Sequence, residues 1–323
     1  MKKYFLGVDG GGTKLLSLLF DEDLNFISSG VGGPINPNFS TLDQVKESMI
    51  QSITGCLPEG FREPIQCCHI TMPGPAELYV ELLSERCPVI ESRRLSEGGA
   101  CLLAGIQKKT GIVALAGTGS GAFYIVDIER MYHLGGWGSL VGDEGSGYDI
   151  GAKGLRAAIY SYDGRGPKTV LEEMFKSYFQ VEDFVEIRSI IYKNPNYRST
   201  LSKLCLLVLQ AARQGDPCAV NIMKEAGKDM ALQVTTLMKR EGVPEKGVDI
   251  VVSGSVWKKN SHMFDSFKQE VQNLYPRIVV SKPLFEPAVG SVVFEAFRLY
   301  DEIDNDRRNH LKEQFQGFLY DPV

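Results

Sequence analysis

The chain has 323 residues, which is longer than one hydrophobic core usually supports, and 43% hydrophobic with 23% charged residues is typical of a globular protein. Its net charge of −5 and lack of a basic stripe argue against a nucleic-acid partner. The longest apolar run, from Leu204, is about half a membrane span, and Asp9 cuts the N-terminal apolar stretch too short for a signal peptide. We therefore expect a cytoplasmic protein that binds neither nucleic acid nor membrane.

The seven cysteines and four histidines indicate no metal-ligand cluster. The cysteines are odd in number and form no CxxC pair, which is typical of reduced thiols that act as small buried hydrophobes. Cys67 and Cys68 are adjacent in a predicted strand, so we expect their side chains on opposite faces.

In chain order, residues 3–30 predict a strand, a glycine turn, a strand, a turn and a strand, and residues 111–136 repeat that order. Such a duplication indicates two similar domains. Between the repeats the patterns predict alternating helices and strands, which is the mark of an α/β fold. These elements are a helix at 42–56, a strand at 65–72, a helix after Pro75, a strand at 88–92 and a helix from about Ser96.

Beyond Gly142 the pattern becomes mostly helical, from 148 to 240, and includes one long helix that starts after Asp216-Pro217 and stops at Gly242. A strand at 248–255, a strand at 277–281 and a last helix after Pro287 follow. We expect an N-terminal domain of residues 1–109, a C-terminal domain of residues 110–300 with a helical insertion, and a charged tail of residues 301–323.

The stretch GVDGGGTK, residues 7–14, nearly matches a P-loop, but LLSLLF follows it as a strand, whereas a P-loop or a dinucleotide fingerprint must open a helix. A hairpin remains, whose glycines can expose backbone N–H groups to an anion. Three glycines alone fit an ordinary hairpin equally well. The hydroxyl of Thr13, the carboxylate of Asp9 as a holder of metal-bound water, and further turns at 117–120 and 253–255 favour a nucleotide.

The motifs GVDGGGTK, GTGS, GGWGSLVGDEGSGYDIGAKGL, QGDPCAVNIMKEAG, GSVW and EPAVGSVVFEA span residues 7 to 297. In this order the chain resembles the N-acetylglucosamine kinases of the BadF/BadG/BcrA/BcrD ATPase group in the actin-hexokinase superfamily. The resemblance implies two ribonuclease-H-like domains with an interdomain cleft, ATP and Mg²⁺ as cofactors, and an amino sugar as substrate. A homodimer is one candidate assembly.

The resemblance also assigns site residues, position by position. Phosphate and nucleoside contacts fall on Gly11, Gly12, Thr13, Thr118, Gly119, Ser202, Gly254 and Ser255, with Asp9 near Mg²⁺. Sugar contacts fall on Asn36, Ser120, Gly136, Trp137, Gly138, Ser139, Leu140 and Asp143. An amide and a carboxylate suit sugar hydroxyls, although Asn36 in an Asn-Pro turn and Asp143 in a glycine-rich loop also fit plain turn roles.

Sugar kinases need a carboxylate that accepts the hydroxyl proton. The family places an aspartate there, in a pattern like DAAGS, and this chain reads SEGGA with Glu97. Glu97 is the base, or a first-turn acid behind the N-cap Ser96, or the mark of a drifted site. Asp143 is the fallback base.

Two rival functions accompany the kinase. A dehydratase-activating ATPase would carry an iron–sulfur cluster on cysteines early in its second domain, and no cysteine lies between Cys101 and Cys205. A catalytically impaired sugar- or nucleotide-binding sensor is the other, and the absence of a helix-turn-helix ahead of the first strand counts against it.

Overall fold

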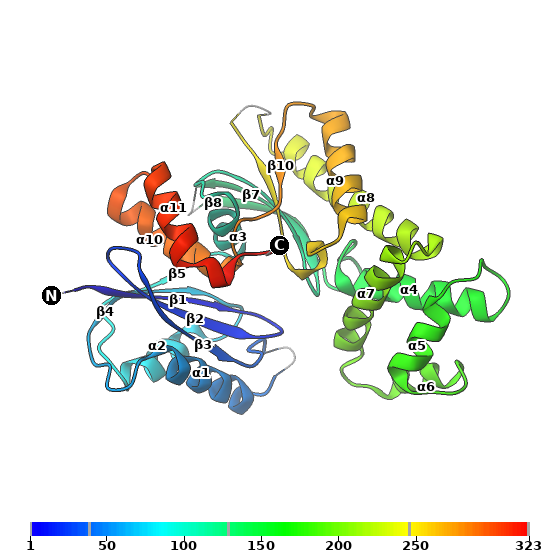
Figure 1. Ribbon diagram of the computed structural model, residues 1–323, viewed down its shortest axis with the longest axis horizontal. Coiled ribbons are helices and arrows are strands. Elements are labelled where there is room, and N and C mark those ends of the chain that lie inside the picture. The colour runs from blue at the N-terminus through cyan, green and yellow to red at the C-terminus, as the bar shows by residue number, and fades with distance from the viewer. Residues whose placement is uncertain (1, 38–39, 128–129, 245–246, 322–323) are drawn as a thin grey trace. The chain divides into compact units, whose positions relative to one another are not determined.

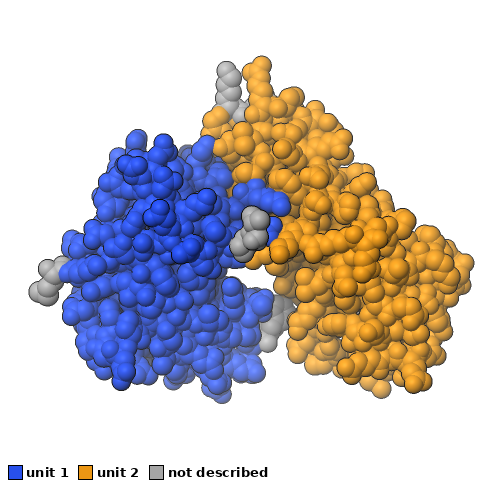
Figure 2. All heavy atoms as spheres, in the orientation of Figure 1, with its two compact units in different colours: residues 1–111, 125–130, 282–323 blue, residues 112–124, 131–281 orange. Residues whose placement is uncertain are grey.

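The computed structural model describes residues 2–37, 40–127, 130–244 and 247–321 and shows helices alternating with strands (Figure 1). The chain forms two compact units, coloured separately in Figure 2. Unit 1 comprises residues 1–111, 125–130 and 282–323, and unit 2 comprises residues 112–124 and 131–281.

The first sheet has five strands in the order β3-β2-β1-β4-β5 and lies in unit 1. Its strands are β1 Tyr4–Gly10, β2 Leu15–Asp21, β3 Phe26–Gly32, β4 Ile65–Thr71 and β5 Ser92–Arg94. β1 pairs antiparallel with β2, and β2 pairs antiparallel with β3. β1 and β5 both pair parallel with β4, so helices connect these strands, as parallel neighbours require.

Helices cover both faces of this sheet. α1 Leu42–Cys56 and α2 Ala76–Ser84 pack in one core, while α3 Glu97–Ile106 and α10 Gly290–Tyr300 pack in the other. Cys67 belongs to the second core and Cys68 to the first, which confirms the expected alternation along β4.

The second sheet has the order β10-β9-β6-β7-β8 and lies mostly in unit 2. Its strands are β6 Gly111–Ala116, β7 Ser120–Asp127, β8 Arg130–Gly135, β9 Ile250–Ser253 and β10 Val280–Ser281. Taken in chain order, these five strands occupy the same relative places as β1 to β5 in the first sheet. The predicted duplication is therefore confirmed in the topology, and each sheet has one glycine turn between its first two strands.

Six helices fill the chain between β8 and β10 within the described residues of unit 2. They are α4 Gly147–Tyr162, α5 Leu171–Phe179, α6 Glu186–Lys193, α7 Tyr197–Arg213, α8 Pro217–Arg240 and α9 Ser261–Leu274. The prediction of one long helix after Asp216-Pro217 is confirmed by α8, whose N-cap Asp216 accepts the N–H of Ala219 and whose Pro217 fills the first turn.

Two expectations differ from the structure. Residues 88–91 pair with β4 through an isolated bridge between Val89 and Ile65 and a few backbone hydrogen bonds, and the edge strand β5 begins at Ser92. Residues 282–300, expected with the second domain, group with unit 1, because Val292, Val293 and Ala296 of α10 pack in its core.

The C-terminal segment folds rather than extending as a tail. α11 Asn305–Gln314 and the 3₁₀ turn Gln316–Phe318 also belong to unit 1, where Leu311 and Phe315 are part of the same core as α10. Among the helices of the described residues, none has the length and apolar composition to cross a membrane.

Candidate active site

The first glycine turn, residues 11–14, joins β1 to β2 in unit 1 and is open to solvent. Gly11 donates its N–H to the carbonyl of Lys14 at 3.0 Å. A Cβ placed on Gly11 or Gly12 would meet no atom within 4 Å, and both Gly12 and Thr13 are exposed. Neither glycine has a positive φ. The two glycines therefore leave their backbone open to close approach, and they do not adopt the left-handed conformation that a nest-like turn would use.

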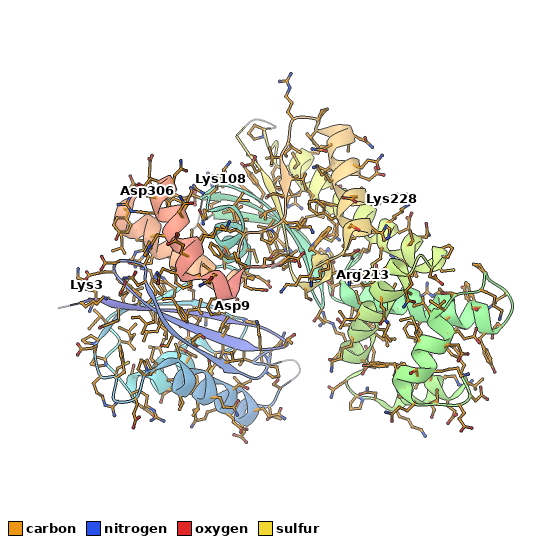
Figure 3. The ribbon with its side chains drawn as sticks, in the orientation of Figure 1. Lys3, Asp9, Lys108, Arg213, Lys228 and Asp306 are labelled. Carbon is orange, nitrogen blue, oxygen red and sulfur yellow. The ribbon has the colours of Figure 1, made fainter. Side chains whose placement is uncertain are left out.

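Three carboxylates lie near this turn. Asp9 is the second-last residue of β1 and is labelled in Figure 3. Burial raises the pKa of Asp9 to about 7, and the charges of Glu97 and Glu286 add to the rise while Lys14 opposes it. Sequence reasoning missed Glu286, although it begins the quoted motif EPAVGSVVFEA, because an acid before Pro-Ala also suits an ordinary turn.

Glu97 is the first residue of α3. Ser96 is the N-cap, and its hydroxyl accepts the N–H of Gly99 at 3.1 Å, as the helix-start interpretation expects. Glu97 stays accessible to solvent, yet the protein atoms around its carboxyl displace enough water to raise its pKa. Gly98 and Gly99 are buried within α3, so they belong to its helical first turn.

Asn36 is brought to the first glycine turn by the backbone. The N–H of Ile35 donates to the carbonyl of Gly11 at 3.0 Å, and Asn36 follows directly as a half-buried residue. Its own carbonyl accepts the N–H of Ser40 at 3.0 Å. In unit 1 the structure thus gathers Asp9, Gly11, Asn36 and Glu97 at one end of the sheet.

The second glycine turn, residues 117–119, joins β6 to β7 and is held in place by neighbouring segments. The carbonyl of Gly117 accepts the N–H of Gly147 at 2.8 Å, which fixes the turn to the start of α4. Gly254, with φ +98°, packs so tightly on Ala116 that an added Cβ would overlap its carbonyl oxygen. The hydroxyl of Ser202 lies 2.9 Å from the place of a Cβ on Gly147.

The predicted nucleotide residues of unit 2 therefore lie around one turn. Thr118 is exposed at its tip, Gly254 and the exposed Ser255 follow β9 beside it, and Ser202 reaches it from α7. Gly254 and Ser255 meet the turn from a distant part of the chain because β6 and β9 are parallel neighbours whose carboxyl ends share one edge of the sheet.

The glycine-rich loop, residues 135–146, has a fixed base and an exposed tip. At the base, the carbonyl of Glu144 accepts from the hydroxyl of Ser120 at 2.8 Å and from the amide of Gln233 at 3.1 Å. At the tip, Trp137 is 79% and Leu140 is 80% exposed. Exposed apolar side chains on a glycine-rich loop are unusual for packing and are compatible with a ligand contact.

Asp143 belongs to the base of this loop and is 2% exposed. Its Oδ1 accepts the N–H of Gly138 at 3.2 Å, and its Oδ2 forms an ion pair with the guanidinium of Arg198 at 3.1 Å. Sequence reasoning missed Arg198, because a lone arginine at the start of a helix has no local signal.

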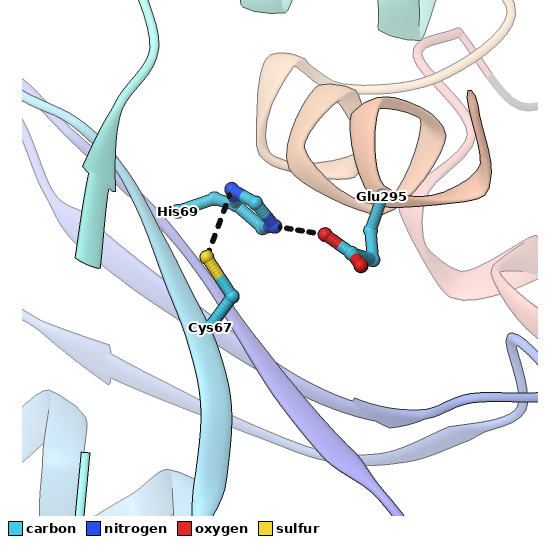
Figure 4. A group of neighbouring side chains, drawn as sticks. All are labelled: Cys67, His69 and Glu295. Atoms are coloured by element: carbon cyan, nitrogen blue, oxygen red, sulfur yellow. Dashed lines mark hydrogen bonds and ion pairs between the residues drawn. The ribbon is translucent and has the colours of Figure 1, made fainter. Parts of the chain in front are cut away.

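Among the described residues, Cys67, His69 and Glu295 form a group of three potential metal ligands (Figure 4). His69 Nε2 lies 2.6 Å from a carboxylate oxygen of Glu295 and its Nδ1 lies 3.8 Å from Sγ of Cys67, so these two partners contact opposite ring nitrogens. Burial raises the pKa of the Cys67 thiol to about 12, and Arg298 already supplies a cation to Glu295 at 2.9 Å. This cluster is a buried polar link between β4 and α10.

Comparison with solved structures defines the fold class. A candidate N-acetylglucosamine kinase from Chromobacterium violaceum is 21% identical, with a TM-score of 0.66 over 90% of this chain and 98% of that chain. The predicted fold class is confirmed: this is a two-domain α/β protein of the actin/hexokinase type. More particularly, residues 6–294 match the BadF/BadG/BcrA/BcrD ATPase family, and the chain belongs to that family.

Two curated relatives are similar over nearly their whole length. The N-acetylmuramic acid/N-acetylglucosamine kinase of Clostridium acetobutylicum is 29% identical over 90% of this chain and 97% of the relative. The N-acetyl-D-glucosamine kinase of Dictyostelium discoideum is 25% identical, again over 90% of this chain and 97% of the relative.

Proposed function

We propose that this protein is an ATP-dependent kinase that phosphorylates the primary hydroxyl of an amino sugar, with N-acetylglucosamine as the first candidate and N-acetylmuramic acid or glucosamine as the others. The family, named for its ATPases, and the names of the two curated relatives support this function. The observation that carries it is the group formed by Glu97, Asp9 and the open first glycine turn.

Glu97 is the proposed base. Phosphoryl transfer depends mainly on positioning and charge, with a carboxylate that accepts the proton of the attacking hydroxyl. Because desolvation raises the pKa of Glu97, its carboxylate holds a proton more readily than an ordinary surface glutamate and is a better acceptor near neutral pH. A glutamate in the first helical turn after Ser96 also suits a role that only stabilises the helix. That role does not explain why the charge of Glu97 acts on Asp9.

Asp9 is the proposed holder of Mg²⁺, directly or through its waters. The donor set fits, because Mg²⁺ prefers oxygen ligands and is usually held by one or two carboxylates together with substrate phosphates. The charges around Asp9 agree with this role: burial raises the pKa of Asp9 to about 7, Glu97 and Glu286 add to the rise, and a divalent cation would relieve their repulsion. When bound, the ion would neutralise charge on the transferred phosphate.

The remaining residues are proposed to bind and orient substrates. Backbone N–H groups at Gly11, Gly12 and Gly119 and the hydroxyls of Thr13 and Thr118 hold phosphates. Ser202, Gly254 and Ser255 are proposed for the nucleoside. The sugar is proposed to contact Asn36, Ser120, Gly136, Trp137, Gly138, Ser139, Leu140 and Asp143.

A coupled assay of ADP release over a panel of amino sugars tests the function. We expect release that requires ATP, a divalent cation and one of the three sugars, with phosphate on the primary hydroxyl of the product. Hydrolysis of ATP at the same rate without any sugar would contradict a kinase and favour the ATPase rival instead.

Location and assembly are further expectations. The seven free cysteines, six of them buried, support the expected reducing cytoplasm. Fractionation of the native cells checks the location, and a protein found mainly outside the cytoplasm would contradict it. The homodimer stays a prediction that sedimentation of the purified protein checks.

A further inference from the structure

The ion pair between Asp143 and Arg198 joins two segments of unit 2 that lie 55 residues apart. Asp143 lies in the glycine-rich loop with φ +60°, a left-handed conformation that is uncommon for a residue other than glycine. Its side chain is almost fully buried, and both carboxylate oxygens are engaged, one by the N–H of Gly138 and one by Arg198. A loop residue in this conformation keeps its orientation only where its surroundings hold it.

Arg198 is well placed to hold it. The residue lies in the first turn of α7, a helix that packs along α4, and α4 is itself tied to the second glycine turn through Gly147. A Cβ on Gly119 would lie 3.0 Å from Oδ2 of Asp143 and 3.4 Å from the guanidinium of Arg198. The pair therefore sits directly against the turn, supported by two helices rather than by the loop alone.

We propose that Arg198 is a positioning residue for sugar recognition, which acts by fixing the carboxylate of Asp143 so that a sugar hydroxyl can donate to it. The inference rests on the proposed function and adds a residue to it. A carboxylate has about four lone-pair positions. Gly138 and Arg198 use one each, which leaves acceptor capacity for a substrate while both oxygens remain fixed in place.

The alternative for an arginine beside a glycine turn is direct contact with a nucleotide phosphate. The structure favours positioning, because the guanidinium of Arg198 pairs with the buried carboxylate of Asp143 at 3.1 Å, and moving the arginine to a phosphate would leave that carboxylate buried without its counterion. The two roles predict different kinetic effects, since Asp143 would govern the sugar and a phosphate contact would govern ATP.

Kinetics of Arg198→Met, Arg198→Lys, Asp143→Asn and the double variant Arg198→Met/Asp143→Asn test the proposal. We expect Arg198→Met to raise the KM for the sugar on the order of tenfold or more, with the KM for ATP within about twofold of wild type. The sugar KM of Arg198→Lys should lie between those of wild type and Arg198→Met, because lysine keeps the positive charge but lacks the planar guanidinium. The double variant should match Asp143→Asn alone, since Arg198 acts through that carboxylate.

Arg188→Met is the matched control, because Arg188 is an exposed arginine on the neighbouring α6, and it should behave as wild type. A higher KM for ATP in Arg198→Met, additive effects in the double variant, or folded variants with unchanged sugar KM would each overturn the proposal. If wild type phosphorylates no amino sugar, the proposed function fails and this inference with it; an active wild type with unaffected Arg198 variants overturns the inference alone.

Discussion

The two glycine turns occupy the same place in two sheets of the same strand order, yet their surroundings differ. The first turn, residues 11–14, has open space around Gly11 and Gly12. The second, residues 117–119, is fixed by Gly147, Gly254 and the Asp143–Arg198 pair. The two sheets thus share one strand order, while the elements packed around their glycine turns differ.

The charges near the turns differ as well. Beside the first turn, burial raises the pKa of Asp9, and the charges of Glu97 and Glu286 add to the rise. Beside the second turn, the buried carboxylate of Asp143 is neutralised by Arg198. We infer that unit 1 supplies the reactive carboxylates and unit 2 supplies a pre-organised binding surface. The following predictions sharpen or break this division.

Glu97→Gln should give the largest effect. Loss of the proton acceptor should lower kcat by about 10²- to 10⁴-fold with little change in the KM for ATP. Glu97→Asp, which restores the residue that the resembling kinases use, should keep much of the activity if the shorter side chain still reaches the hydroxyl. Steady-state kinetics with the preferred sugar measure both.

Glu173→Gln is the control for this experiment, because Glu173 is an exposed acid in the first turn of α5 and shares only the helix-dipole role. Full activity of Glu97→Gln, with loss of kcat in Asp143→Asn, would move the base to Asp143 and reverse the assignment of the two units.

Gly254→Ala should destabilise the protein by about 2–4 kcal/mol. Its φ of +98° is unfavourable for alanine, and the added Cβ would overlap the carbonyl oxygen of Ala116 on the neighbouring strand. Thermal unfolding measures the loss, and Gly242→Ala is the control, because it too has a positive φ but open space around it. Equal losses of stability in the two variants would show that the positive φ alone, and not the contact with Ala116, causes the destabilisation.

The sequence predicted the elements that have local signals more accurately than those defined by tertiary contacts. Periodicity and caps predicted α1 to its exact residues and α8 from Asp216-Pro217, because both signals are local. The same holds for the two glycine turns, each bounded by apolar strands. The edge strand β5 was misplaced by a few residues because 88–94 carries no strong alternation, and the pairing that defines a short edge strand is tertiary.

The site divides in the same way. Glu97 and Asp9 could be named from motif positions, but the effect of Glu97 on the pKa of Asp9 depends on the fold. Glu286 acts on Asp9, Arg198 pairs with Asp143, and Glu295 contacts His69, and each of these pairs is separated by 55 or more positions. No local pattern records such contacts, so only the folded chain reveals them.

Asp9→Asn should stabilise the ligand-free protein at pH 8. Because the pKa of Asp9 is about 7 in the folded state against 3.8 as its ordinary value, the folded protein binds a proton more tightly than the unfolded chain between those pH values. Stability therefore falls as pH rises from about 4 to 7, and asparagine removes that loss. We expect Tm at pH 8 to rise by about 2–6 °C and Tm at pH 4 to change little.

Added Mg²⁺ separates the metal role from simple repulsion. At pH 8 the ion should raise the Tm of wild type and not that of Asp9→Asn, because binding requires the ionised carboxylate. Activity of wild type should decline as pH falls through 7, where Asp9 becomes protonated. A Tm difference that is the same at pH 4 and pH 8 would show that Asp9 has an ordinary pKa.

Gly12→Ala should give the smallest effect and the cleanest contrast with Gly254→Ala. The added methyl group meets no protein atom within 4 Å and needs no positive φ, so Tm should stay within about 2 °C of wild type. The same methyl group would stand where phosphate approaches the backbone, so the KM for ATP should rise by about three- to tenfold. Gly317→Ala, equally open but on the C-terminal 3₁₀ turn, should leave both quantities unchanged. If Gly12→Ala lowers Tm without changing the KM for ATP, the first turn has only a structural role. Phosphate binding would then depend on the second turn alone.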